Sequence, residues 1–257
     1  MSWCDKLAST PAVGFRLDYH YTPSHYILQG LSPILDRAME GDVRKFSIEK
    51  SDTFEVQFTT EEGFTYGIDE SKISVTFNHQ LRTKAVSGGH PVMEMLSKAL
   101  PYTVLLPEVS KKVIEATVLL AADPGTRKVT RVGIVSSTRV AEEEAPPGLA
   151  RFITYLGRPW TRLTEGFGVQ LTGEIGKESD WSDKCIHTIV KPGTQDPQPL
   201  LALVFDWQRT YISGRPTDKA SLEDMLRTAE AAALEYFEEL AEGSRFDENL
   251  IRDTASA

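Results

Sequence analysis

The residues best placed to do chemistry follow an apolar run in the C-terminal half of the chain. Leu200–Phe205 is continuously hydrophobic, and the polar sequence DWQR at 206–209 comes directly after it. A carboxylate at the end of a buried strand can act as a general base when its surroundings raise its pKa. Asp206 and Arg209, together with His20 in the N-terminal half, therefore form the residue set of a hydrolase or nuclease hypothesis.

A structural role for the same residues is the simpler interpretation, because the sequence names no catalytic partner for Asp206. A run that is apolar on both faces is typical of a central strand covered on both sides. Its polar end then marks where the strand leaves the core, with Asp206 and Arg209 paired to neighbouring strands and Trp207 packed under a loop. We assign no catalytic residue.

Metal and cofactor chemistry have little support in the sequence. The histidines that could supply metal ligands are His20, His25, His79, His90 and His187. No pair has the i, i+4 spacing of two ligands on one helix face, and a metal site needs three or more converging ligands. The signatures of phosphate-binding loops, dinucleotide-binding turns, zinc peptidases and EF-hands are absent. We predict no metal and no cofactor.

A group of aromatic residues gives a second functional hypothesis. Gathered around a concavity, tryptophans and a late phenylalanine would line an apolar small-molecule pocket under the last helix, or a partner surface. Scattered singly, they would be ordinary core residues. The candidate ligand or partner surface consists of Trp160, Trp181, Asp206, Trp207, Arg209 and Phe237.

Hydrophobic periodicity gives the elements that position these residues. In the first half it predicts a strand at 12–21, a helix at 22–42 and an antiparallel meander of four short strands over 44–81. A short helix is expected at 90–100. A longer helix follows at 106–123, although its Val and Ile content also allows a strand.

The second half repeats this order. A capping box of Ser221 and Asp224 and a C-terminal Gly243 bound the last helix. The expected elements are a strand at 129–140, a helix at 149–160, strands at 166–176, 184–192 and 200–212, and the helix at 221–242.

The repeated order predicts an α+β protein of two similar lobes. Each lobe would be an antiparallel sheet covered by helices, and a long C-terminal helix would close the second one. The expected boundaries are an N-terminal tail at 1–10, an N-terminal lobe at 11–122, a C-terminal lobe at 128–243 and a polar tail at 244–257.

Composition limits the classes of function and location. The chain has 257 residues, of which 40% are hydrophobic and 25% charged, and a net charge of −9. No apolar stretch approaches the ~20 residues of a membrane helix and no signal peptide is visible, so a cytoplasmic location without membrane contact is expected. The acidic balance disfavours nucleic acid as a partner. With only Cys4 and Cys185, no disulfide framework is expected.

Segments of the C-terminal half resemble a sporadically distributed family of uncharacterised prokaryotic proteins of about this size. VTRVGIVSSTRV at 129–140 is similar to a mid-chain, arginine-flanked strand of that family. LLALVFDWQRTYI at 200–212, followed by a long helix carrying Phe237, is similar to its Asp-bearing terminal strand and closing helix. PAVGFRLDYHY at 11–21 matches an early strand after a proline only loosely. The resemblance implies architecture and a prokaryotic origin, and no known activity.

The sequence thus favours a non-catalytic binding or protein-interaction component, in a multi-protein or defence-type system. Self-association or a protein partner is expected. The alternatives are a small-molecule-binding protein with its pocket under the C-terminal helix, and the hydrolase or nuclease described above.

Overall fold

The computed structural model describes the chain with gaps. The described residues are 3–18, 33–34, 36, 46–51, 55–69, 71–79, 81–84, 92–95, 100–120, 127–157, 166–191, 193 and 200–245. Most of the expected helix at 22–42 lies outside them, and the three described residues within it, 33, 34 and 36, are helical. His20, His25, His90, Trp160 and nearly all of the expected polar tail also lie outside them.

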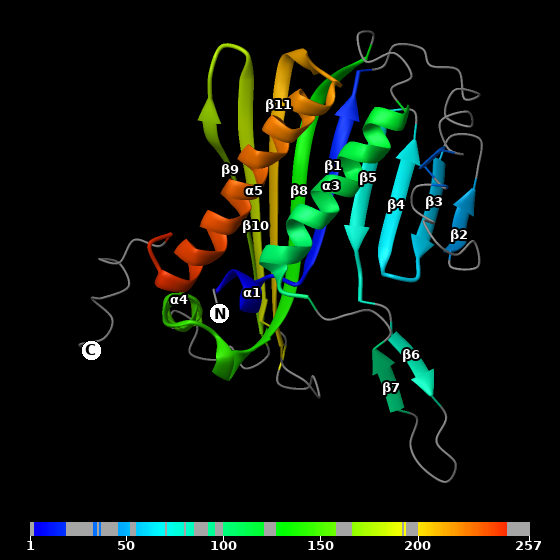
Figure 1. Cartoon of the computed structure of the whole chain (residues 1–257). Helices are drawn as coiled ribbons and strands as arrows, with labels where there is room; N and C mark the ends of the chain where they lie inside the picture. Colours follow the sequence, from blue (N-terminus) through cyan, green and yellow to red (C-terminus); the bar gives the residue numbers. More distant parts are fainter. Residues whose placement is uncertain are drawn as a thin grey trace.

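Most of the described strands form one continuous antiparallel sheet rather than two lobes with separate sheets. Nine strands stand in the order β2-β3-β4-β5-β1-β8-β11-β10-β9 (Figure 1). β1 and β8, which open the two halves of the chain, are hydrogen-bonded neighbours at the centre. The strands are β1 (Thr10–Leu17), β2 (Phe46–Ser51), β3 (Glu55–Thr60), β4 (Phe64–Asp69), β5 (Lys72–Phe77), β8 (Lys128–Ala141), β9 (Phe167–Lys177), β10 (Trp181–Lys191) and β11 (Leu200–Pro216).

Each half contributes its strands in the same way. β5 closes the first meander and pairs with β1, while β11 closes the second and pairs with β8. The α+β class and the C-terminal helix are confirmed. The separate sheets expected for two lobes are not found in the described part, because the β1–β8 ladder joins the halves into one sheet.

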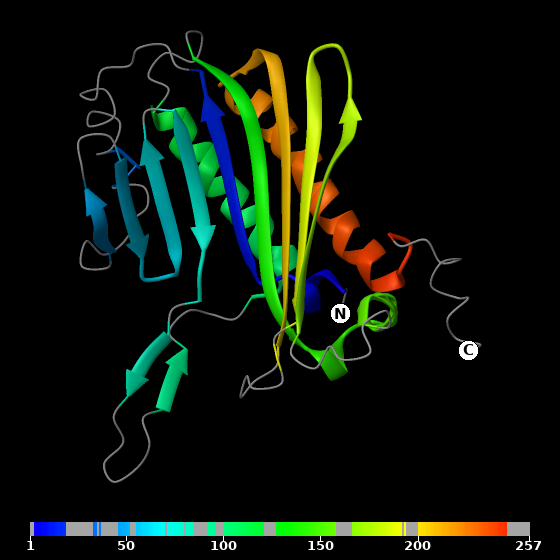
Figure 2. The ribbon, with the colours of Figure 1, turned by 180° about the vertical axis from the view of Figure 1, so that it is seen from behind.

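Two long helices cover one face of this sheet. α3 (Tyr102–Leu120) packs on β1 and β5, and α5 (Lys219–Glu242) packs on β8 and β11. Figure 1 shows both helices in front of the strands, and Figure 2, from behind, shows the strands in front of the helices. α1 (Cys4–Leu7) contacts both long helices, and α4 (Pro147–Gly157) packs against α5 after the short 3₁₀ turn η1 (Glu142–Glu144).

Strand alternation places the core between the sheet and these helices. On β1, Val13, Phe15 and Leu17 are buried, whereas the intervening residues are partly or fully exposed. Apolar side chains of α3 and α5 meet this face, and Phe237 of α5 stacks edge-on against Tyr102 of α3. Burying one face of a sheet under helices removes its apolar side chains from water and leaves the other face open.

Two expectations about local structure are wrong. Residues 92–95, expected in a helix, form strand β7 (Val92–Met95), which pairs with β6 (Leu81–Lys84) in a separate two-stranded sheet. The N-cap of α5 is Asp218, whose carboxylate accepts a hydrogen bond from the Ser221 amide, so Ser221 lies inside the helix. Gly243 does end α5, with φ of 90°.

The apolar run at 200–205 does not end at a strand terminus. β11 continues to Pro216, so Asp206 and Arg209 lie within it. The N-terminal segment expected as a tail holds α1, in which Cys4 and Leu7 are buried against the core. Among the described helices, none combines the length and apolar composition needed to cross a membrane.

Candidate functional site

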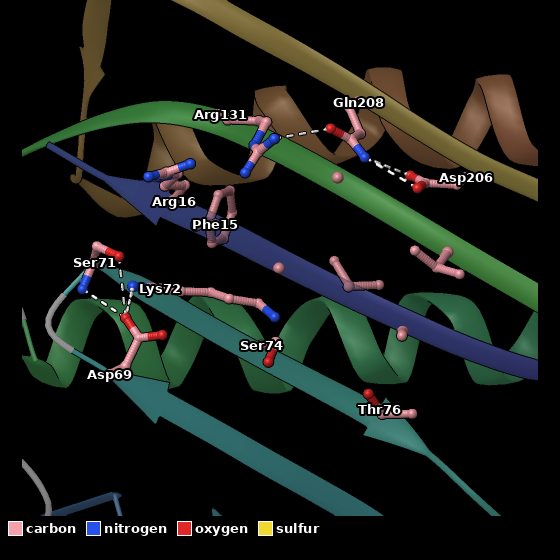
Figure 3. Close-up of a pocket in the computed structure, with 15 residues that line it drawn as sticks. Phe15, Arg16, Asp69, Ser71, Lys72, Ser74, Thr76, Arg131, Asp206 and Gln208 are labelled. Carbon is pink, nitrogen blue, oxygen red and sulfur yellow. Dashed lines mark hydrogen bonds between the residues drawn. The ribbon is translucent and has the colours of Figure 1, made fainter. Parts of the chain in front are cut away.

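The open face of the sheet carries a hollow at its centre. The hollow encloses about 330 Å³ over β1, β5, β8 and β11, on the side away from the helices (Figure 3). A second hollow of about 410 Å³ shares Arg16, Ser71 and Arg131 with the first. A cavity of a few hundred Å³ is the size that small-molecule sites have.

Small residues share one row of the sheet, and three of them, Gly14, Ser74 and Gly133, form the floor of the hollow. Gly67 on β4 pairs with Ser74 on β5, Ser74 pairs with Gly14 on β1, and Gly14 pairs with Gly133 on β8. At Gly14, a Cβ atom would lie 3.1 Å from the Ile73 carbonyl oxygen, so even alanine is tight there. The row leaves backbone accessible where larger side chains would fill the space.

Three cationic residues stand side by side at one end of this floor. Arg16 on β1 is directly opposite Lys72 on β5 and Arg131 on β8. Arg16 and Lys72 are exposed and Arg131 is half-buried. Like charges directly opposite one another on a sheet are destabilising, so this row has an electrostatic cost that a bound anion would offset.

Only one of the three cations has a polar side-chain partner within the described residues. Arg131 Nη1 donates to Gln208 Oε1 at 3.0 Å. Neither Arg16 nor Lys72 makes a side-chain hydrogen bond or an ion pair with another described residue. Two charged heads therefore remain available at the edge of the hollow.

The hollow also contains two carboxylates, which accept hydrogen bonds from different kinds of donor. Asp69 caps the β4–β5 turn: its Oδ1 accepts from the amides of Ser71 and Lys72, both at 2.7 Å. Asp206 on β11 accepts from Gln208 Nε2 with both oxygens, at 2.9 and 3.0 Å. Asp69 is thus a turn residue, whereas Asp206 belongs to a chain of polar side chains that runs through Gln208 to Arg131 (Figure 3).

Asp206 and Arg209, expected together at a strand end, are on opposite faces of β11. Asp206 faces the open side, and Arg209 faces the helix side beside Trp207, because side chains alternate along a strand. Arg209 binds Asp183 of β10 through two hydrogen bonds of 2.6 and 2.7 Å. The structure therefore does not join Asp206 and Arg209 in one site, while the expected pairing of Arg209 with a neighbouring strand is found.

The aromatic residues of the expected surface are also separated from the hollow. Trp207 and Phe237 are buried in the core between sheet and helices. Trp181 lies against the guanidinium of Arg209, with Cζ 3.9 Å from the ring centroid. In the described part, these aromatics contribute to packing and to an ion-pair cluster, and none lines the hollow.

A cysteine and a histidine lie close together under α5, as in a nucleophilic dyad, but they do not have the thiolate–imidazolium charges of one. Cys185 Sγ lies 3.8 Å from His187 Nδ1. Burial raises the pKa of Cys185 to about 12 and lowers that of His187 to about 4. The pair is therefore a neutral thiol and a neutral imidazole at pH 7, without the thiolate that nucleophilic catalysis requires.

Metal-binding geometry is likewise not seen in the portion that the structure describes: no three His, Cys, Asp or Glu residues there could hold an ion together. His79 and His187, the two described histidines, do not share a site with each other.

Sequence reasoning missed the residues of the hollow except Asp206. Arg16, Lys72 and Arg131 are far apart in the sequence, and only the β5-β1-β8 strand order makes them neighbours. The available signal was the polar alternation in AVGFRL and VTRVGIV, which exposes Arg16 and Arg131 on one face once both segments are strands.

No protein-family model matches the chain, and no curated protein matches it. Among solved structures, the di-domain ARO/CYC protein BexL from the BE-7585A biosynthetic pathway aligns over 90% of this chain and 98% of its own, with 8% identity and a TM-score of 0.21.

Proposed function

We propose that this chain is a non-catalytic binding protein that takes an anionic small molecule in the hollow on the open face of its sheet. The anionic group would lie over Arg16, Lys72 and Arg131. The remainder of the molecule would lie on the floor formed by Gly14 and Gly133.

The observation that carries this proposal is the row of three cations directly opposite one another. A sheet that bound nothing here would gain from a neutral or acidic residue at one of these positions. Instead, Arg16 and Lys72 make no side-chain ion pair within the described residues, and the hollow beside them has a floor of glycine and serine. Guanidinium groups bind carboxylates and phosphates through paired hydrogen bonds.

The proposal places the ligand on the side of the sheet opposite to the one first expected. A pocket under the C-terminal helix would need space among Trp207, Phe237 and their neighbours. Those side chains are closely packed: Phe237 has ring contacts with Tyr102, Phe205 and Tyr236. The open face offers both the space and the charge.

The test is isothermal titration calorimetry with adipate and with pyrophosphate at low ionic strength. Arg16→Gln and Arg131→Gln should each weaken binding by about tenfold, because each removes a charge-assisted hydrogen bond. Arg227→Gln is the matched control, since Arg227 is an exposed arginine on α5. Equal affinities in all four proteins would contradict the proposal.

A protein partner or second copy on the same face would give a different result. Light scattering on the titrated samples would then show an assembly, and the small anions would not bind until it dissociated. Anion binding by a monomer supports the small-molecule proposal.

A further inference from the structure

Asp206 places a carboxylate in the hollow, away from the row of three cations. Its carboxylate is half-buried, with Val135 and Ile186 as its direct neighbours in the row. Among described residues, only Gln208 Nε2 donates to its side chain. A carboxylate has about four acceptor positions, so Asp206 retains capacity for a donor placed in the hollow.

Gln208 fixes the position of the Arg131 guanidinium relative to the Asp206 carboxylate. Its amide oxygen accepts from Arg131 at 3.0 Å, and its amide nitrogen donates to Asp206 at 2.9 Å. The reverse amide orientation would place the nitrogen against the guanidinium and the oxygen against the carboxylate. Through this bridge, the Arg131 guanidinium and the Asp206 carboxylate are held no more than about 8 Å apart.

Among the described residues, two other charged side chains, Asp69 and Lys184, do not pair with Asp206. Asp69 is held by the turn before β5. Lys184 on β10 is opposite Gln208 and diagonal to Asp206, but it is exposed, and the described residues show no ion pair between it and Asp206. Asp69 lies beside Lys72 at the cationic end, so Asp206 is the carboxylate at the end of the hollow away from Arg16 and Lys72.

Beside the Gln208 bridge, β1 and β8 carry only apolar side chains or none between Arg131 and Asp206. Gly14 and Gly133 lie in the floor row, and Val135, which is 37% exposed, lies beside Ala12 in the next row. A short aliphatic segment would cover this surface without leaving a polar group unpaired.

We infer that the ligand is a zwitterion, with a carboxylate over Arg16 and Arg131 and an ammonium group on Asp206, separated by a short aliphatic segment. The inference rests on the proposed function, because it assigns the second end of the same ligand. Gln208 is then a positioning residue that sets the spacing between the two charges.

Three probes of matched length test this inference by calorimetry: 6-aminohexanoate, adipate and 1,6-diaminohexane. Extended 6-aminohexanoate spans about 7 Å between its charged groups. It should bind at least tenfold more tightly than the other two. In the wild-type protein, 4-aminobutyrate and 8-aminooctanoate should both bind more weakly than 6-aminohexanoate, a comparison that does not depend on any variant.

Asp206→Asn should weaken 6-aminohexanoate about tenfold and leave adipate unchanged or tighter, because it removes a negative charge from the site. Glu174→Gln on β9 is the control, since Glu174 is an exposed acid outside the hollow. If adipate binds as tightly as 6-aminohexanoate to the wild-type protein, the zwitterion inference is wrong and anion binding stands. If neither carboxylate probe binds but pyrophosphate does, the zwitterion inference is wrong and anion binding stands. If pyrophosphate does not bind either, both proposals fail.

Discussion

Arg209 and Asp183 form a two-point ion pair across β10 and β11. Nε and Nη2 of Arg209 lie 2.6 and 2.7 Å from the two carboxylate oxygens of Asp183, and the two side chains are 16% and 9% exposed. The guanidinium also lies against Trp181. Both hydrogen bonds raise the pKa of Arg209, so its guanidinium stays protonated.

The first prediction is that this pair stabilises the fold rather than serving catalysis. Arg209→Ala leaves the buried Asp183 carboxylate without its partner and should lower the free energy of unfolding by about 3 kcal/mol. Arg215→Ala is the control, because the Arg215–Asp180 pair is equally short but about half exposed; it should cost less than about 1 kcal/mol. Urea denaturation measures both. Equal losses would show that burial does not set the contribution of Arg209.

A second prediction contrasts the two opposed glycines of the central strand pair. A Cβ at Gly14 would meet backbone and side-chain atoms at 3.1 and 3.2 Å, whereas at Gly133 the nearest atoms are 3.5 and 3.7 Å away. Gly14→Ala should therefore destabilise by about 1 kcal/mol. Gly133→Ala should be neutral or stabilise by about 0.5 kcal/mol, by restricting the unfolded chain. Thermal denaturation of the two variants checks the order; a more stable Gly14→Ala would contradict it.

The third prediction concerns pH and His187. Burial under α5 lowers the pKa of His187 from 6.5 to about 4, and the positive charge of Arg245 acts in the same direction. Between these values the unfolded chain binds a proton that the folded protein does not. Stability should thus fall as pH drops through 6.5 toward 4, by up to roughly 2 kcal/mol after allowance for partial exposure.

His187→Phe removes the titration while keeping a ring to stack on Tyr236, which lies 4.8 Å from the imidazole. Urea denaturation at pH 4.5 and pH 7.5 should show a smaller difference for this variant than for the wild type. An unchanged difference would assign the acid sensitivity to other groups.

A fourth prediction is that both thiols are unreactive in the folded protein. Burial raises the pKa of Cys185 to about 12, and the Cys4 thiol is buried and donates to the Leu234 carbonyl at 3.2 Å. A thiol reagent such as DTNB at pH 8 should label neither residue until denaturant is added. Rapid labelling of Cys185 in the native state would instead reveal access beneath α5.

The elements that could be predicted from sequence are those with sustained periodicity. Alternation identified the β2–β5 meander and β8–β11, and three- and four-residue spacing identified α4 and α5. A helix is also expected for α3, although its Val and Ile content leaves a strand open. Residues 92–95, VMEM, were misassigned because a short apolar run has no periodicity that separates strand from helix. The N-cap was misplaced because Asp218 and Ser221 are both good capping residues, and only the hydrogen bond identifies Asp218.

The candidate site could not be predicted, because it depends on strand order. Lys72, Arg16 and Arg131 become neighbours only when β1 lies between β5 and β8, a long-range pairing that local patterns do not encode. The run at 200–205 also suggested burial on both faces. Its buried residues are Leu201, Leu203 and Phe205, while Ala202 and Val204 belong to the partly exposed face.

The proposed binding site in the hollow is tested most directly by locating the residues that a small anion contacts. Backbone amide chemical shifts of ¹⁵N-labelled protein, recorded during titration with adipate and 6-aminohexanoate, locate binding residue by residue. Binding in the hollow should concentrate the shifts at Gly14, Ser74, Gly133 and Val135, which surround it. Shifts centred on Trp207 and Phe237 would place the ligand under α5 and contradict it.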